Sequence, residues 1–287
     1  MRARGRIVIV GAGNLGSALA VSLRRAGYVI ESVVAHSRGR SLKRADKLAR
    51  KVAARASTNV PARVNADLVW FCVPDSEIAP ASCSLSEGGA WKGRVALHSS
   101  GALSSDELAV LRAQGAAVAS VHPLMTFVRR SNPSLVGVPF AVEGDVAAVR
   151  TVRRIISDLG GHAYPIRKRE KAAYHAWATF ASPLFTALLA TSENVGSAAG
   201  VSRAAARRRM IPILLQTLAN YASFGAPGAF SGPIIRGDID TIKRHMRALA
   251  KLPEAHAVYV ALAKAALCYL PARNKKEMRE VLQSGQR

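Results

Sequence analysis

The sequence is poor in acidic residues: 18 Asp and Glu stand against 41 Lys and Arg, which gives a formal net charge of +23. Such a charge attracts polyanions over long distances. The basic residues are spread along the whole chain, and their clusters at 38–51, 203–209 and 273–276 are not interleaved with the aromatic side chains that a base-stacking surface needs. We therefore expect nonspecific nucleic-acid binding at low salt, if any, and no functional nucleic-acid partner.

Cysteine is scarce as well. Cys72, Cys83 and Cys268 form no CxxC pair and show no metal-ligand spacing. This pattern argues against a disulfide framework and against a metal site. It favours a reducing compartment, so we expect a cytoplasmic protein.

Long apolar runs are absent too. The longest, residues 180–190, falls short of the roughly 20 residues that a bilayer-spanning helix needs, so we expect no membrane segment. The first 20 residues have the outline of a secretory signal, with a basic start and an Ala-x-Ala ending. Three glycines interrupt their apolar run, and we interpret them as a strand, a turn and a helix of the mature protein.

What the sequence does contain, up to about residue 165, is an alternation of short β-branched runs with helical patterns, typical of a parallel sheet covered by helices. Candidate strands are 6–10, 29–35, 67–73, 94–98, 117–121 and 138–142. Candidate helices begin near Asn14, Ser41 and Ser104, and a further one follows Asp145, a residue suited to cap it.

From Lys168 onward the strand-like runs stop and Ala-rich helical stretches follow. They predict helices at 171–195, 202–224, 238–251 and 253–270 and a short one from Asn274. The fold class is thus a doubly wound α/β Rossmann domain followed by an all-α domain. We place the first domain at 1–166 and a helical substrate or dimerisation domain at 167–287.

A glycine motif joins the first strand to the first helix. In "RIVIVGAGNLGSALA", Gly11, Gly13 and Gly16 have GxGxxG spacing. The first glycine permits the tight turn, the second lets the backbone approach a pyrophosphate, and the third lets helix and strand pack closely. The helix N-terminus offers free N–H groups to the phosphates. We predict dinucleotide binding here, with Asn14 and Leu15 as further contacts.

The end of the second strand indicates which dinucleotide. An acidic residue there would hold both ribose hydroxyls of NAD and repel a 2′-phosphate. This chain instead reads His36-Ser37-Arg38, with Arg40 next, a hydroxyl and guanidinium groups suited to a phosphate dianion. NADP is therefore the predicted cofactor, and the alternative is an ordinary solvated basic loop.

Two further segments are expected along the cofactor. The apolar run 67–73 ends in Cys72-Val73-Pro74, which would follow the cofactor's edge, although a plain core strand would look similar. Ser99, after the strand 94–98, could bind the nicotinamide amide, or cap the following turn.

Candidate catalytic residues follow two neighbouring strands, where ligands collect in an open parallel sheet. "LHSSGALSS" carries Ser100, and "SVHPLMTF" carries His122 and Thr126. Hydride transfer to a carbonyl or imine needs a proton donor, and imidazole suits that task near neutral pH. We predict His122 as that donor and Thr126 as a substrate contact; the alternative for His122 is a structural histidine.

The helical domain supplies the remaining candidates. Lys171 and His175 lie four residues apart on one helix face and could face an interdomain cleft, with Lys171 binding an acidic substrate. A solvated lysine and a core histidine are the alternative. In "FSGPIIRGD", a turn at Ser231 and Gly232 followed by Arg236 could clamp a carboxylate or phosphate, or be simply a turn before a helix capped by Asp238.

Several of these motifs together resemble a known family. "GAGNLG" and "VPD" resemble NADP enzymes of the pyrroline-5-carboxylate reductase and 6-phosphogluconate dehydrogenase type. "HSSGALSS", "HPLMTF", "GVPFAVEGD", "YHAWATFAS" and "SGPIIRGD" resemble, over nearly the whole chain, a bacterial family of predicted oxidoreductases with a Rossmann-like domain and a helical domain of unknown function numbered 2520.

The resemblance implies an N-terminal NADP domain and a helical domain that dimerises. It also places His122 where prephenate dehydrogenases have a His-Pro in the substrate pocket, and residues 231–232 where pyrroline-5-carboxylate reductases have a substrate-site turn. Ser182-Pro183 departs from the family pattern, in which Asn follows "FAS", and Pro183 should perturb its helix.

These inferences combine into one functional hypothesis: an NADP-dependent oxidoreductase that passes hydride to or from a carbonyl or imine of a small, anionic substrate. The competing hypothesis from another class is an NADP-binding sensor or scaffold without turnover.

Overall fold

The computed structural model describes residues 4–58, 66–87, 91–129, 131 and 133–284. The chain divides into two compact units, Met1–Thr179 and Phe180–Arg287. The sequence places a domain boundary earlier, after residue 166, and that boundary stays a prediction.

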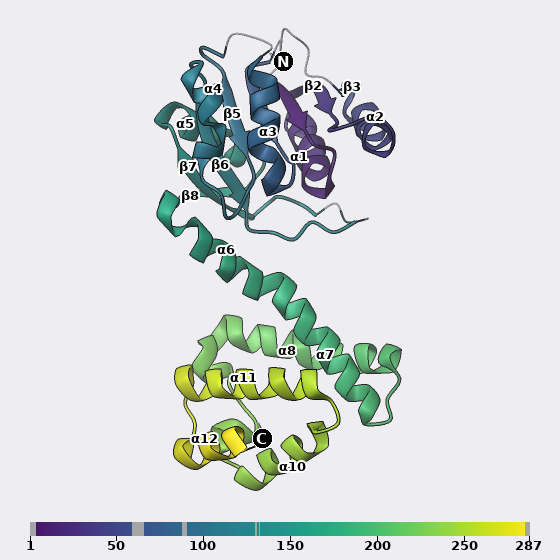
Figure 1. Cartoon of the computed structure of the whole chain (residues 1–287), viewed down its shortest axis with the longest axis vertical. Coiled ribbons are helices and arrows are strands. Elements are labelled where there is room, and N and C mark those ends of the chain that lie inside the picture. The colour runs from purple at the N-terminus through teal and green to yellow at the C-terminus, as the bar shows by residue number, and fades with distance from the viewer. Residues whose placement is uncertain (1–3, 59–65, 88–90, 130, 132, 285–287) are drawn as a thin grey trace. The chain divides into compact units, whose positions relative to one another are not determined.

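The first unit is built on an eight-stranded sheet with the order β3-β2-β1-β4-β5-β6-β7-β8. Figure 1 shows this sheet with the helices that accompany it. The strands are β1 (Arg6–Val10), β2 (Val29–Val34), β3 (Arg55–Ser57), β4 (Leu68–Phe71), β5 (Val95–His98), β6 (Ala117–Pro123), β7 (Pro139–Gly144) and β8 (His162–Pro165). The six predicted strands are confirmed. β3 and β8 escape sequence reasoning because they are short edge strands without an apolar run.

All neighbouring strands are parallel except β6 and β7, which run antiparallel. The sheet is thus mostly parallel, as expected, with one antiparallel pair of strands. Two parallel neighbours need a crossover connection, usually helical, whereas the connection between Pro123 and Pro139 contains no helix in its described residues. The chain therefore enters β7 from the same edge at which it leaves β6.

Helices cover both faces of the sheet. They are α1 (Asn14–Arg25), α2 (Arg40–Val52), α3 (Asp75–Ser86), the 3₁₀ turn η1 (Ser105–Leu108), α4 (Ala109–Ala113) and α5 (Val146–Asp158). Apolar side chains of α1, α2 and α5 pack in one core, and those of α3, η1 and α4 pack in a second core on the other face. The doubly wound Rossmann arrangement is thus confirmed, although α3, which contains Pro80, was not predicted as a helix.

Asp145 stands at the N-terminus of α5, as expected, but its side chain does not cap the helix. Its carboxylate instead accepts hydrogen bonds from the Val118 amide (2.9 Å) and the Arg112 guanidinium (3.1 Å). The residue therefore ties α5 to β6 and α4. The first unit ends with the 3₁₀ turn η2 (Lys168–Glu170) and α6 (Lys171–Thr179).

The second unit is helical throughout its described residues. It starts with a π-helical turn, η3 (Phe180–Leu184), followed by α7 (Phe185–Ala198), α8 (Arg203–Ala229), α9 (Pro233–Arg236), α10 (Ile239–Leu249), α11 (Pro253–Tyr269) and α12 (Lys275–Ser284). Pro183 lies inside η3, so the predicted perturbation of the helix at this proline is confirmed. A second break occurs at Gly225 in α8, where the backbone leaves the helical region.

The core of the second unit joins α10, α11 and α12. It contains Ile242, Met246, Val260, Leu267, Met278 and Leu282. Asp238 precedes α10 at the predicted position, but its side chain pairs with Arg236 instead of capping the helix. Among the described residues, no helix combines the length and the apolar character that crossing a membrane requires.

Candidate functional site

The strand order reverses between β1 and β4, the point at which open α/β sheets bind ligands beyond the carboxyl ends of their strands. The glycine turn lies here, and its geometry explains two of the glycines. Gly11 has φ +103°, and a Cβ on it would lie 2.5 Å from the Cys72 carbonyl oxygen. A Cβ on Gly16 would lie 2.1 Å from the Gly11 carbonyl oxygen. Only glycine fits either position.

Gly13 differs, because a Cβ there would meet nothing within 4 Å. It precedes α1, whose N-terminus has no side-chain cap and no acidic residue in its first turn. The first amides of α1 are therefore open to an anion. This is the arrangement that a dinucleotide pyrophosphate requires.

Asn14 and Leu15 face different surroundings. The Asn14 side-chain amide donates a 3.0 Å hydrogen bond to the Phe127 carbonyl, which links the glycine turn to the loop after β6. Leu15 packs against the core shared by α1, α2 and α5. Their predicted cofactor contacts would thus run through the backbone.

The segment after β2 is exposed at His36, Ser37, Arg38 and Arg40. Residues 35–40, all described, include no Asp or Glu, and the Glu77 carboxylate lies 3.5 Å from the His36 ring. Within the described residues neither Arg38 nor Arg40 forms an ion pair, so both guanidinium groups are available to an incoming anion.

Cys72, Val73 and Pro74 connect β4 to α3 beside the glycine turn. The Cys72 amide donates to the Val10 carbonyl at 2.7 Å, which holds the two loops together. Burial raises the pKa of the Cys72 thiol to about 12, so this cysteine stays protonated and unreactive. Ser99 turns inward: its hydroxyl accepts a 2.8 Å hydrogen bond from the Trp70 indole.

The turn after β5 is tied together by its own side chains. The His98 ring accepts from the Ser100 amide through Nδ1 (3.2 Å) and donates through Nε2 to the Ser104 carbonyl (2.9 Å). Burial lowers the pKa of His98 to about 4, which keeps the ring neutral. The Ser100 hydroxyl accepts from the Leu103 amide at 2.9 Å. Both side chains thus shape the turn around Gly101.

Lys171 is fully buried at the start of α6. Its ammonium donates to the Ser120 hydroxyl (2.7 Å) and to the Ser100 carbonyl (3.0 Å). The expectation of a solvated or cleft-facing lysine is therefore wrong, because the side chain reaches back onto β6. Burial lowers the pKa of Lys171 to about 8, against the opposing pull of the Glu143 and Asp75 carboxylates.

His122 is half-buried at the end of β6, and only one of its ring nitrogens is engaged. Nδ1 lies 2.7 Å from the Tyr174 hydroxyl, whereas Nε2 has no hydrogen bond to any described residue. Burial, reinforced by His175 and Lys171, lowers the pKa of His122 to about 4. The ring is therefore neutral at pH 7.

Gly101 and His175 lie on the Nε2 side of this ring. A Cβ on Gly101 would lie 3.0 Å from His122 Nε2 and 2.5 Å from His175 Cδ2. The two imidazole rings meet edge to face, with centroids 5.8 Å apart. The structure thus brings together His122, His175, Lys171 and Ser100 from the predicted catalytic set.

Two periodicities explain this convergence. Residues 171, 174 and 175 share one face of α6, and residues 120 and 122 share one face of β6. Lys171 therefore lies over Ser120 while Tyr174 lies over His122. Buried Tyr174 is held in turn by edge contacts to the Tyr164 ring.

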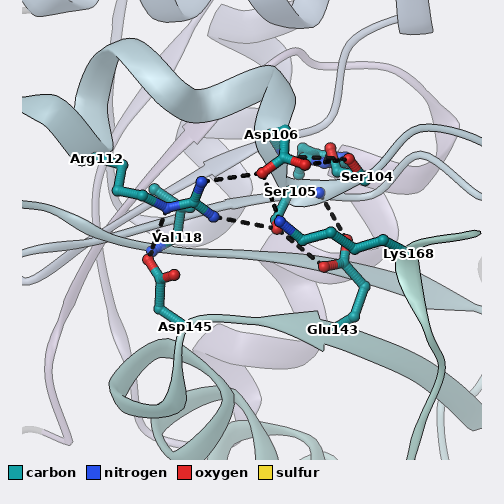
Figure 2. A network of polar contacts seen from close by, with 9 residues as sticks. Ser104, Ser105, Asp106, Arg112, Val118, Glu143, Asp145 and Lys168 are labelled. Carbon is teal, nitrogen blue, oxygen red and sulfur yellow. Dashed lines mark hydrogen bonds and ion pairs between the residues drawn. The ribbon is translucent and has the colours of Figure 1, made fainter.

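A polar network fixes the start of α6, as Figure 2 shows. Lys168 pairs with Asp106, which also accepts from Arg112 at 3.0 Å. These two bonds, that of Lys168 foremost, lower the pKa of Asp106 to about 2. Buried Glu143 accepts from the amide of Ser105 at 2.6 Å and from its hydroxyl at 2.9 Å. The network ties η1, α4 and β7 to the turn that leads into α6.

Sequence reasoning missed Ser120, Glu143 and Tyr174. Ser120 could have been noticed as a polar residue in an apolar strand, "AVASVHP", and Glu143 likewise in "FAVEG". Tyr174 stands directly before His175, so only the helix register on β6 shows its contact with His122.

The remaining predicted residues lie elsewhere. Thr126 is exposed on the loop after β6. Ser231, Gly232 and Arg236 lie in the second unit, around the short helix α9, and Arg236 donates to Asp238 at 2.9 Å. In the described ranges no three His, Cys, Asp or Glu side chains gather as a metal site would require.

Comparisons with known proteins agree with this architecture. Residues 1–123 match the family model of a Rossmann-like domain, and residues 138–266 match that of the domain of unknown function DUF2520. The two matches cover successive parts of the chain, the Rossmann-like model first and the DUF2520 model after it. The α6 face that contacts β6 thus belongs to the DUF2520 match, and β6 to the Rossmann-like match.

Solved structures share this fold. A Bacteroides fragilis protein assigned as an NADP oxidoreductase is 24% identical, with a TM-score of 0.77 over 91% of this chain and 97% of that one. A Thermotoga maritima protein is 23% identical, with a TM-score of 0.68 over 98% and 100%. A reductive aminase from Aspergillus terreus, solved with NADPH and ethyl levulinate, is 18% identical, with a TM-score of 0.63 over 92% and 93%. No curated protein sequence matches this chain.

Proposed function

We propose that this protein is an NADP-dependent oxidoreductase that transfers hydride to or from a carbonyl or imine of a small, anionic substrate. The single observation that carries the proposal is His122: one ring nitrogen is held by Tyr174, and the other is unbonded beside Gly101 at the carboxyl edge of the sheet. His98, by contrast, uses both ring nitrogens to shape its turn.

The residues present fit the cofactor. The uncapped α1 N-terminus and the open Gly13 suit the pyrophosphate, and Ser37, Arg38 and Arg40 suit a 2′-phosphate. The nicotinamide end would extend past Cys72, Val73 and Pro74 toward the turn at Ser99. When bound, NADP supplies or accepts the hydride. The NADPH bound to the similarly folded reductase of A. terreus supports this choice.

The chain's own residues would orient and polarise the reacting group. His122 hydrogen-bonds the oxygen or nitrogen of the reacting group through Nε2, and His175 lies beside it. Lys171 and Ser100 do not reach the substrate directly in this proposal, because both are buried. They hold the turn that carries Gly101, and the Lys171 charge adds a positive potential that favours an anionic substrate.

The remaining parts of the proposal do not involve His122 and the residues around it. Thr126 would contact the substrate from the loop after β6, and Ser231, Gly232 and Arg236 would bind an anionic group. The helical region would form a homodimer. The protein would work in the cytoplasm.

The test has two steps. NADPH and NADH are titrated against the protein, and we expect tighter binding of NADPH. NADPH oxidation is then followed with a panel of small keto acids and cyclic imines, using wild type and His122→Ala. Turnover that His122→Ala abolishes while NADPH still binds supports the proposal. Saturable NADPH binding without oxidation anywhere in the panel favours a sensor or scaffold, and equal binding of the two dinucleotides contradicts the NADP assignment.

A further inference from the structure

Tyr174 was not among the predicted site residues, yet it makes the one hydrogen bond that His122 has in the described chain. The hydroxyl lies 2.7 Å from Nδ1, and the two rings stand edge to face at 84° with centroids 5.5 Å apart. Tyr174 is buried and is flanked by Tyr164 and Trp177, at ring-centroid distances of 6.4 and 5.9 Å. Its hydroxyl is thus fixed opposite the imidazole.

Either group could in principle donate in this bond, but the chemistry selects one direction. A phenol is far more acidic than the N–H of a neutral imidazole, and the imidazole lone pair is far more basic than a phenol oxygen. Burial, with the neighbouring Tyr164 hydroxyl adding to it, also raises the pKa of Tyr174 above its ordinary value, so the hydroxyl keeps its hydrogen. The O–H therefore donates, and Nδ1 accepts.

We propose that Tyr174 is a positioning residue that holds His122 in the tautomer with its hydrogen on Nε2. The N–H then points to the side of the ring where Gly101 and His175 lie. Any group that binds His122 there must present a lone pair. A ketone or aldehyde oxygen, a carboxylate or an unprotonated imine nitrogen satisfies this demand, whereas an iminium or ammonium N–H does not.

This choice of acceptor groups rests on the proposed function, but the tautomer does not. The neutral ring is required for the tautomer to exist at all, and the groups around His122 keep it neutral. Burial of the ring is the main cause, and His175 and Lys171 of α6 also oppose its protonation.

The test is nitrogen-15 NMR of the imidazole rings in the full-length protein at pH 7, without cofactor or substrate. The chain has seven histidines, and His122→Gln assigns the signal of interest. We expect the wild-type ring to show a protonated Nε2 and a hydrogen-bonded, unprotonated Nδ1. In Tyr174→Phe the Nδ1 signal should move toward that of a free imidazole nitrogen, and the tautomers should mix.

The chain contains a matched control. In the second unit, His245 Nδ1 lies 3.0 Å from the Tyr259 hydroxyl with the rings at 89°, the same arrangement at another place. Tyr259→Phe should change the signal of His245 and leave that of His122 unaltered. The reverse should hold for Tyr174→Phe.

A hydrogen on Nδ1 of wild-type His122, or a Tyr174→Phe spectrum with the wild-type His122 signals, overturns the proposal. Should Tyr174→Phe fail to fold, fluorotyrosine incorporated throughout the wild-type protein gives the same answer. The more acidic phenol should shift Nδ1 of His122 and His245, and an unshifted His122 again overturns the proposal. These readouts need no turnover, so an inactive enzyme with the expected tautomer would contradict the proposed function alone.

Discussion

The ammonium of Lys171 donates a 2.7 Å hydrogen bond to the hydroxyl of Ser120, and this contact joins α6 to the strand that carries His122. Ser120 pairs with Glu143 across the β6–β7 ladder, so the two side chains share a face of the sheet. A buried cation, a hydroxyl and a buried carboxylate thus lie in sequence across three elements. Lys171 thus acts on the candidate site indirectly, by holding α6 against the strand that carries His122.

Removing this cation should weaken the first unit. Lys171→Met keeps most of the length of the side chain but removes the ammonium that donates to the Ser120 hydroxyl and the Ser100 carbonyl. We expect the free energy of unfolding to fall by about 1–3 kcal/mol, and by about 1 kcal/mol in Ser120→Ala. Urea denaturation at pH 7 measures both. Because the residues touch, the double variant should lose less than the sum, by at least about 0.5 kcal/mol.

The matched control is Lys47→Met on exposed α2, which should stay within about 0.5 kcal/mol of wild type. If the double variant lost as much free energy of unfolding as Lys171→Met and Ser120→Ala lose together, the coupling of α6 to β6 through this bond would be contradicted.

The lack of space for a side chain at Gly101 leads to a second prediction. The backbone of Gly101 does not have a positive φ, so alanine is allowed there by conformation and excluded by the two histidines. We expect Gly101→Ala to cost about 1–3 kcal/mol in stability and to displace the His122 or His175 ring. Thermal unfolding and the imidazole NMR signals report the two effects. An alanine that leaves both ring signals in place would show that Gly101 does not limit this side of His122.

The fold could be predicted from sequence where local chemistry decides it. β-branched runs predicted the six strands, and the glycine spacing predicted the turn before α1. The short edge strands β3 and β8 form because neighbouring strands are already in place, and neither has a pattern of its own. Asp145 and Asp238 were placed correctly at helix starts, but Arg112 and Arg236 compete successfully for their carboxylates.

Most residues of the candidate site could be predicted from the sequence, but their contacts with one another could not. His122, Ser100, Lys171 and His175 could each be named from strand ends and helix spacing. Their mutual contacts depend on the register of α6 on β6, which Lys168 and Asp106 help to set from outside the site. Lys171 shows the consequence, because its spacing suggested a ligand contact and its packing makes it a buried support.

Two glycines of the glycine turn should affect different properties: Gly13 the binding of NADPH, and Gly16 the stability of the fold. Gly13→Ala meets open space, so we expect a change in the free energy of unfolding below about 0.5 kcal/mol. A methyl group there would obstruct the pyrophosphate, so NADPH binding should weaken at least tenfold. Gly16→Ala instead forces a methyl group into the Gly11 carbonyl and should unfold the protein at lower temperature, whether or not NADPH is present. Fluorescence titration and thermal unfolding measure the pair. Unchanged NADPH affinity in Gly13→Ala would contradict phosphate binding at this turn.

Acid should destabilise the first unit through its buried histidines. His98 is fully buried with both nitrogens bonded, and its pKa is lowered to about 4 from the ordinary 6.5. Between these two values the unfolded chain binds more protons than the native state, so stability falls as the pH falls from 6.5 to 4 and changes no further through this group below 4. The shift corresponds to about 3 kcal/mol. His122, with a pKa near the same value, adds a second loss over the same range.

Urea denaturation at pH 7, 5.5 and 4 tests this. His98→Gln should be less stable than wild type at pH 7, because the glutamine cannot reproduce both hydrogen bonds, yet its stability should fall less steeply on acidification. The difference between the two proteins should therefore shrink by about 3 kcal/mol toward pH 4. Exposed His162 supplies the control, since His162→Gln should follow the wild-type curve. Parallel curves for wild type and His98→Gln would mean that the native state does not lower the pKa of His98, and the donor and acceptor roles assigned to its neutral ring would then be wrong.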